Sequence, residues 1–223
     1  MSFHPGQTFT FGETPSATKW NYLWENDYAL QDWSAFTNDT FPIALIQDGD
    51  ITAAKLDADA IGHGFLEIGR TTLGSTGTSV SVQNLPAFKY LKIIAYIIPT
   101  GGTLNVGIRF NNDSGGNYAE RGSSNGAADA LGTALNQINT KTAIDANPQL
   151  TTLEGLNIAA VEKLFIAEST IRGSSGAAAA PDRKLGVYKW VNTAAQISRV
   201  DAVDTGGTGD IAAGSEVVVF GKN

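Results

Sequence analysis

The stretch Leu104-Asn105-Val106-Gly107-Ile108-Arg109-Phe110 decides the fold class, because every second residue in it is apolar. A period of two places alternate side chains on opposite faces of an extended chain, so this pattern predicts a strand with one buried face. The preceding stretch 91–98 (LKIIAYII) is apolar on both faces after Lys92. That composition is typical of a central strand covered on both sides, or of a strand at a subunit interface.

Further strand candidates follow one another from residue 65 to the C-terminus, separated by turns rich in glycine, serine and asparagine. They are residues 65–72, 79–83, 117–121, 135–143, 160–172, 184–192, 197–203 and 215–221. An Ala-rich stretch at 125–132 is the exception and favours one helical turn. So many short strands without a long helical pattern predict an all-β fold, a jelly-roll-like antiparallel β-sandwich over residues 64–223.

Residues 1–63 differ from this body and predict an N-terminal arm with one or two helices. Thr14 and Pro15 suit a helix start, since threonine caps free N–H groups and proline lacks one. A second short helix is expected at 52–61. Large, mostly aromatic side chains also form a stripe in this arm. Because one helix cannot bury such a stripe against itself, the stripe must pack on the body, on another copy of the chain or on another protein. The stripe is our candidate assembly interface, formed by Trp20, Leu23, Trp24, Tyr28 and Trp33.

The net charge of the protein is concentrated in the same arm. Residues 1–63 hold nine acids and two bases, a balance of −7, whereas residues 64–223 hold 13 of each. Because an acidic chain repels phosphates, we expect no nucleic-acid partner. Alternatively, the acids only keep an exposed arm soluble. No apolar run is long enough to cross a bilayer and no signal peptide pattern opens the chain, so we expect synthesis in the cytoplasm and no membrane insertion.

Residues suited to catalysis are few. The chain has no cysteine, and its two histidines, His4 and His63, both lie outside the predicted body. No nucleophile elbow, phosphate-binding loop or zinc-protease motif occurs, so we expect no enzyme and no cofactor. A pair of carboxylates for glycoside hydrolysis stays open, because such pairs meet in space and not in sequence.

Two oxygen-rich loops are candidates for calcium, namely Asn111 to Gly115 and the loop flanked by Asp201, Asp204 and Asp210. Neither matches an EF-hand, and the same residue types form tight turns without a metal. We therefore favour turns and no metal site, with calcium binding left open. Candidates for glycan binding are the aromatic residues Tyr96, Tyr118, Tyr188 and Trp190, although strand alternation also allows several of them to lie in the core or at an interface.

Three stretches carry a resemblance to known proteins. The first, FGETPSATKWN at residues 11–21, contains P-S-A-x-K-W-N and is followed by an acidic segment at 48–56. The second is IRFNNDSGGNY at 108–118, and the third is the C-terminal GDIAAGSEVVVFG at 209–221. In this order and at comparable places, they resemble stretches of tailed-bacteriophage virion structural proteins, of the fibre, tail-appendage and head-decoration type. The motifs are short, and they are spread across nearly the whole chain.

The resemblance implies a virion protein, commonly a homotrimer, attached to other virion proteins of the capsid or tail through residues 1–63. We therefore expect a short trimeric fibre or spike-like protein, located in the virion and assembled in the host cytoplasm. Its β-sandwich would be displayed and could contact the host surface, including a host surface glycan. Two alternatives remain: a capsid decoration protein that stabilises the head, and a stand-alone carbohydrate-binding module.

Overall fold

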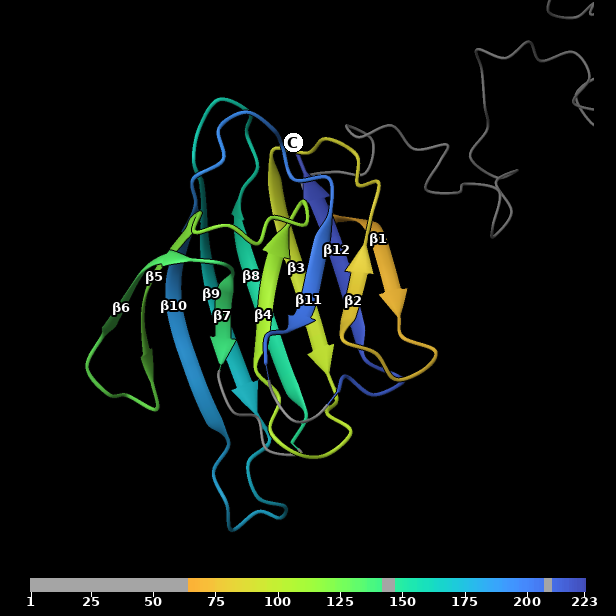
Figure 1. Cartoon of the computed structure of the whole chain (residues 1–223), viewed down its shortest axis with the longest axis vertical. Coiled ribbons are helices and arrows are strands. Elements are labelled where there is room, and N and C mark those ends of the chain that lie inside the picture. The colour runs from red at the N-terminus through yellow and green to blue at the C-terminus, as the bar shows by residue number, and fades with distance from the viewer. Residues whose placement is uncertain (1–63, 142–146, 207–209) are drawn as a thin grey trace, which may run out of the picture. The chain divides into compact units, whose positions relative to one another are not determined.

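A computed structural model describes residues 64–141, 147–206 and 210–223, and every regular element in this part of the chain is a β-strand (Figure 1). The predicted arm with its helices lies outside the described residues, and so does its aromatic stripe of Trp20, Leu23, Trp24, Tyr28 and Trp33. No helix among the described residues is long and apolar enough to cross a membrane.

The strands form two antiparallel sheets, one with eight strands and one with four. The larger sheet has, in spatial order, β1 (Leu66–Thr72), β12 (Glu216–Lys222), β3 (Tyr90–Ile97), β8 (Gln149–Leu156), β9 (Lys163–Ile171), β10 (Asp182–Trp190), β5 (Tyr118–Ser124) and β6 (Ala130–Leu135). The smaller sheet has β2 (Ser79–Val82), β11 (Val200–Asp204), β4 (Val106–Phe110) and β7 (Ile138–Lys141). Figure 1 shows the smaller sheet lying in front of the larger one.

The core lies between the two sheets and follows the alternation of the strands. In β9 the odd-numbered side chains from Lys163 to Ile171 are buried and the even-numbered ones are exposed. The stretch used to predict the fold class contains β4, whose Val106, Ile108 and Phe110 are buried in the same core. The predicted all-β antiparallel sandwich is therefore confirmed, while the jelly-roll connectivity stays a prediction.

An aromatic cluster closes one end of this core. The ring of Phe110 stacks on Phe165 with 4.8 Å between centroids and lies 5.7 Å from the ring of Trp190. Tyr118 stacks on Trp190 at 6.3 Å, and its hydroxyl accepts a hydrogen bond from the Phe110 N–H at 2.9 Å. The Trp190 indole N–H donates to the Asp113 carboxylate at 2.7 Å. The large rings are thus buried with their polar groups hydrogen-bonded, as buried tyrosine and tryptophan require.

Two segments differ from the sequence-based expectation. The Ala-rich stretch 125–132 contains no helical turn, because Asn125 and Gly126 adopt the left-handed backbone of a tight turn, with φ of 53° and 79°. The chain then pairs with β5 as β6, and this pairing outweighs the helix preference of alanine. The sequence pattern also predicts no strand at 149–156, where the structure has β8.

We expect Gly155→Ala to destabilise the larger sheet, because a side chain has no room at this position. A Cβ on Gly155 would clash with the Leu164 carbonyl oxygen and lie 2.5 Å from the Phe165 ring. Overpacking of this kind costs about 1–3 kcal/mol of unfolding free energy, which urea denaturation measures. The matched control is Gly74→Ala, whose Cβ would meet no atom within 4 Å. Equal stability of the two variants would contradict the close packing of β8 against β9.

Candidate functional site

The outward face of the larger sheet carries large apolar side chains where a solvated strand face would be polar. Ile166 is 70% exposed and Leu131 is 67% exposed. Contiguous apolar surface of this kind is uncommon on monomeric soluble proteins and marks an interaction site. We call this surface the outer apolar face; its members are Tyr90, Tyr96, Leu131, Leu150, Leu164, Ile166, Leu185 and Val187.

Strand register brings members of this face together. Ile166 of β9 pairs with Val187 of β10, and Val187 pairs with Arg121 of β5. Arg121 pairs in turn with Leu131 of β6. Directly paired side chains in neighbouring strands lie within about 5.5 Å of one another at Cβ. One row of directly paired residues therefore crosses β9, β10, β5 and β6, with the charged Arg121 between apolar residues.

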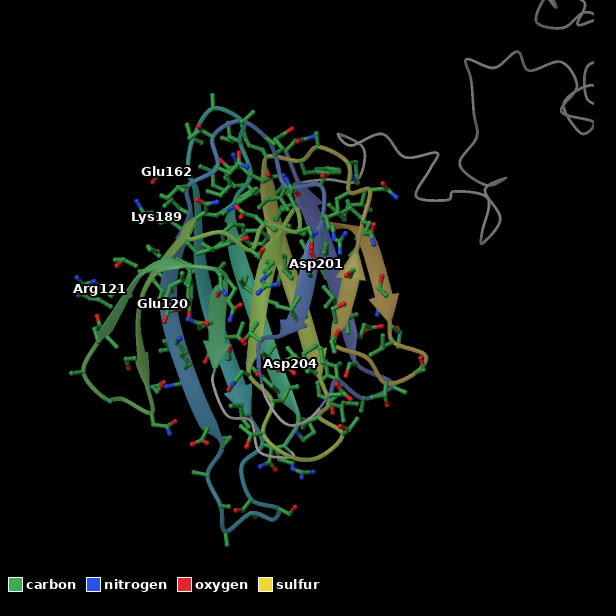
Figure 2. All side chains as sticks on the ribbon, viewed as in Figure 1. Glu120, Arg121, Glu162, Lys189, Asp201 and Asp204 are labelled. Atoms are coloured by element: carbon green, nitrogen blue, oxygen red, sulfur yellow. The ribbon has the colours of Figure 1, made fainter. Side chains whose placement is uncertain are left out.

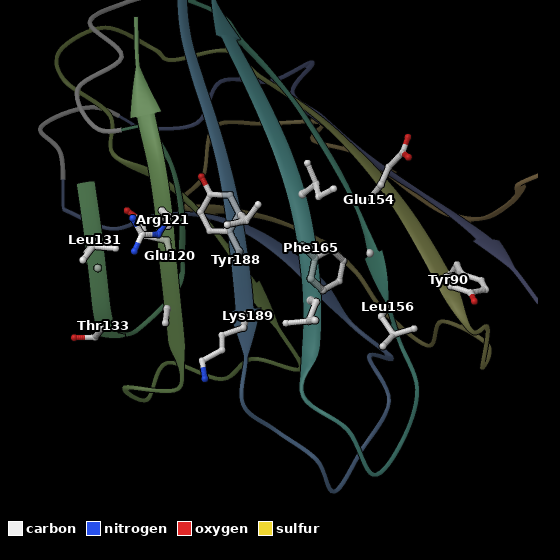
Figure 3. Close-up of a pocket in the computed structure, with 16 residues that line it drawn as sticks. Tyr90, Glu120, Arg121, Leu131, Thr133, Glu154, Leu156, Phe165, Tyr188 and Lys189 are labelled. Atoms are coloured by element: carbon white, nitrogen blue, oxygen red, sulfur yellow. The ribbon is translucent and has the colours of Figure 1, made fainter. Parts of the chain in front are cut away.

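The outer apolar face is hollowed, and Figure 3 shows the lining residues. The main hollow has a volume of about 740 Å³ and lies over β5, β6, β8, β9 and β10. Two smaller hollows, of about 480 and 380 Å³, share lining residues with it and extend it toward Leu185 and toward Phe65. The apolar side chains exposed in the main hollow are largely aliphatic: Leu131, Leu156, Leu164, Ile166 and Val187.

Charged side chains of both signs border the main hollow. Lys92 forms an ion pair with Glu154 at 2.6 Å, and Lys189 forms one with Glu162 at 3.1 Å. Figure 2 shows Glu162 and Lys189 together at one end of the sandwich, with Arg121 further along β5. Charged groups thus lie directly beside the apolar side chains, since Ile166 pairs with Glu154 and Leu164 pairs with Lys189.

The buried Lys163 has a structural role. Its ammonium group donates to the carbonyl oxygens of Val161 at 3.0 Å and Asn192 at 2.7 Å, and lies 5.7 Å from the centre of the Trp190 ring. Burial lowers the pKa of the Lys163 ammonium group. Lys163 does not line any of the three hollows. Lys163 therefore holds the loop before β9 and the loop after β10 together.

The first candidate calcium loop, Asn111 to Gly115, is a turn in which the side-chain oxygens of Asn111 and Asp113 accept hydrogen bonds. The Asp113 carboxylate accepts hydrogen bonds from the Gly115 N–H at 2.9 Å and from the Asn117 amide at 3.0 Å, besides the one from Trp190. Burial raises the pKa of the Asp113 carboxyl, but these hydrogen bonds outweigh it and hold the pKa below its ordinary value. The geometry thus supports the turn interpretation.

The second candidate loop is described only in part, because residues 207–209 lie outside the described chain. Asp201 is buried and binds the Arg199 guanidinium at 2.7 Å. Asp204 accepts hydrogen bonds from the N–H groups of Asn105 and Gly206, and Asp210 is exposed. Among the described residues, no group of three or more histidine, aspartate or glutamate side chains is placed to hold a metal ion.

Three of the four aromatic residues predicted to bind a glycan belong to the core. Tyr118, Tyr188 and Trp190 are at most 4% exposed. Their assignment to a glycan site is wrong, because their side chains fall on the inward parity of β5 and β10 and stabilise the sandwich. Tyr96 is 41% exposed and belongs to the outer apolar face.

No family model matches the sequence, and no curated protein matches it either. A solved structure that was found is that of the tripod (BppUct-A-L) from the baseplate of bacteriophage Tuc2009. It shares 12% sequence identity with this chain, and the match covers 97% of this chain and 98% of that one with a TM-score of 0.24. A score this low establishes neither a common fold nor a common role.

We expect Asp113→Asn to destabilise the sandwich and to weaken the response of its stability to acid. A carboxyl whose pKa is lower in the folded state stabilises the fold above its ordinary pKa, and this contribution disappears as pH falls through the folded-state pKa. Loss of these charge-assisted hydrogen bonds should cost about 1–3 kcal/mol near pH 7. Thermal unfolding between about pH 7 and pH 2 measures both effects. Asp129→Asn, at an exposed position, is the control; an equal effect there would contradict the role of Asp113.

Proposed function

We propose that this protein is a non-enzymatic structural component of a bacteriophage virion, a short trimeric fibre or spike-like protein. Residues 1–63 anchor it to other virion proteins, and the sandwich is displayed where it can contact the host surface. The observation that carries this proposal is the outer apolar face, because an exposed aliphatic surface with ion pairs beside it suits contact with protein. The three sequence stretches that resemble virion proteins supply the setting.

The carboxylates near the main hollow support a role without catalysis. A glycosidase needs two carboxyl groups flanking one substrate bond, one of them free to donate a proton. Of the acids whose residues line the hollow, Glu154 turns its side chain to the outward face, whereas Glu120 shares the inward parity of its partner Tyr188. The Glu120 carboxylate binds Lys184 at 3.2 Å, and the Glu154 carboxylate binds Lys92. The two carboxylates lie on opposite faces of the larger sheet, and each forms an ion pair with a lysine, so they do not flank one substrate bond.

The location of the protein on a particle tests the proposal. Gold-labelled antibodies against the sandwich should bind purified particles of the phage that encodes this chain, at the tail or at another appendage. Labelling spread over the head would favour the capsid decoration alternative. Particles that carry none of the protein, by labelling and by mass spectrometry, would contradict any virion role.

We expect a chain of residues 64–223 to stay folded but to lose attachment to the particle. The described residues supply a hydrophobic core of their own, with members from Ile68 to Val219. Binding of the purified chain to particles that lack it measures attachment, and circular dichroism checks the fold. In the full chain, Trp20→Ala with Trp24→Ala should weaken attachment by about 2 kcal/mol or more per residue if both are interface anchors. Normal attachment of the shortened chain would contradict the docking role of residues 1–63.

A further inference from the structure

The outer apolar face suits a protein surface better than a sugar or a small apolar ligand. Its main hollow lies open on a sheet face, whereas small-molecule sites usually enclose most of the ligand surface. Sugar sites need polar groups that converge on hydroxyls, but the carboxylate and ammonium groups of Glu154 and Lys189 are held in ion pairs. Tyr90 is the exposed aromatic side chain that lines the hollow. The surface thus lacks the chemistry of a glycan platform.

The extent of the face matches a stable interface between proteins. Eight strands at about 4.8 Å spacing, with about seven residues each at about 3.3 Å, cover roughly 900 Å². A standard protein–protein interface buries about 800 Å² on each partner. The whole outward face of the larger sheet is therefore large enough for a stable contact without help from the rest of the chain.

The charges around the face indicate what kind of protein fits it. Three bases and two acids border the main hollow: Lys92, Arg121 and Lys189, with Glu154 and Glu162. A strongly acidic or strongly basic partner would leave one sign unmatched at such a mixed rim. A surface that carries both signs can match a second copy of itself, because each acid finds a base on the partner.

The edge of the larger sheet extends this surface. Edge strand β6 (ALGTAL) contains no charged residue and no proline, the usual means of keeping a free edge from pairing. Its Leu131 is 67% exposed and continues the row from Ile166 and Val187. An interface over the hollow can therefore continue onto this edge.

We propose that the outer apolar face is the surface through which copies of this chain associate, each turning this face toward a shared axis. The inference rests on the proposed function for its setting, a virion protein present in several copies, and it names the contact surface and the partner. Ile166, Val187 and Leu164 form the apolar part of the contact, and the Lys92–Glu154 and Lys189–Glu162 pairs lie directly beside them. This contact is distinct from the predicted aromatic stripe of residues 20–33.

Light scattering with the full-length protein over a dilution series tests the inference. The wild-type protein should have a mass that is a multiple of 23.4 kDa, and three copies are expected from the proposed function. Ile166→Glu should raise the dissociation constant at least about 30-fold, because it places a charge at the centre of the contact. Ile166→Lys should also raise the dissociation constant. Because glutamate and lysine carry opposite charges, a rise with both variants would show that burial of a charge disrupts the contact whatever its sign.

Val161→Glu is the matched control, since Val161 is an exposed valine of the loop before β9 that lines none of the hollows. It should leave the mass unchanged. Circular dichroism and thermal unfolding should show that all three variants are folded, as expected for substitutions at exposed positions. Should either Ile166 variant unfold, Val187→Glu replaces it.

A monomeric wild-type protein, or a wild-type oligomer unaffected by both Ile166 variants, would overturn the inference. In the first case another protein covers the face, and in the second the copies join elsewhere, as through residues 1–63. A dimer that Ile166→Glu dissociates would support the contact surface but contradict the trimeric state in the proposed function. Absence of the protein from virions would contradict the proposed function. The mass measurements would then still show whether copies associate through the outer apolar face.

Discussion

The register of β9 is the constraint on which the rest of the molecule depends. Its odd-numbered residues, Phe165 and Ala167 among them, enter the core, and this leaves Leu164 and Ile166 on the outward face. A slip of one residue would exchange the two faces, burying Glu168 and exposing Phe165. Because β9 pairs with β8 on one side and β10 on the other, its register also places the apolar residues of both neighbours. The core and the outer apolar face are therefore consequences of a single alignment.

The unequal sizes of the two sheets explain how a sandwich can retain such a surface. The larger sheet has twice as many strands as the smaller one, which packs against its inner side alone. Next to β7, the edge strand of the smaller sheet, large side chains of β10 complete the core. The Tyr188 hydroxyl donates to the Asn139 carbonyl in β7 at 3.3 Å, and the Lys184 ammonium group donates to the same oxygen at 2.7 Å. These contacts support the inner side of the larger sheet as far as β5. Among the described elements, no second layer lies over its outer side.

Sequence reasoning identified the strands whose alternation is clean, such as β4, and the doubly apolar stretch 91–98 that contains most of β3. It missed β8 because Gln149 and Thr151 point inward there while Leu150 points outward, so apolar character no longer follows one parity. The outer apolar face was missed as a whole, although one signal was available: Leu164 and Ile166 are apolar at the exposed parity of a strand. The aromatic residues were poor indicators of a glycan site, because the order of residues along the chain does not reveal which tyrosines are buried in the core. Only register between distant strands brings Ile166, Val187 and Leu131 together.

The order of strands has a consequence for the way this protein is made. β12, the last strand, lies between β1 and β3, which are the first and third of the described strands, and β11 occupies an interior position in the smaller sheet. Neither sheet has all its strands until residues 200–222 have been synthesised. Pairings so distant along the chain also carry a large loop-closure entropy, which slows folding. The first strands of the sandwich therefore stay incompletely paired until the strands more than a hundred residues later in the chain are available.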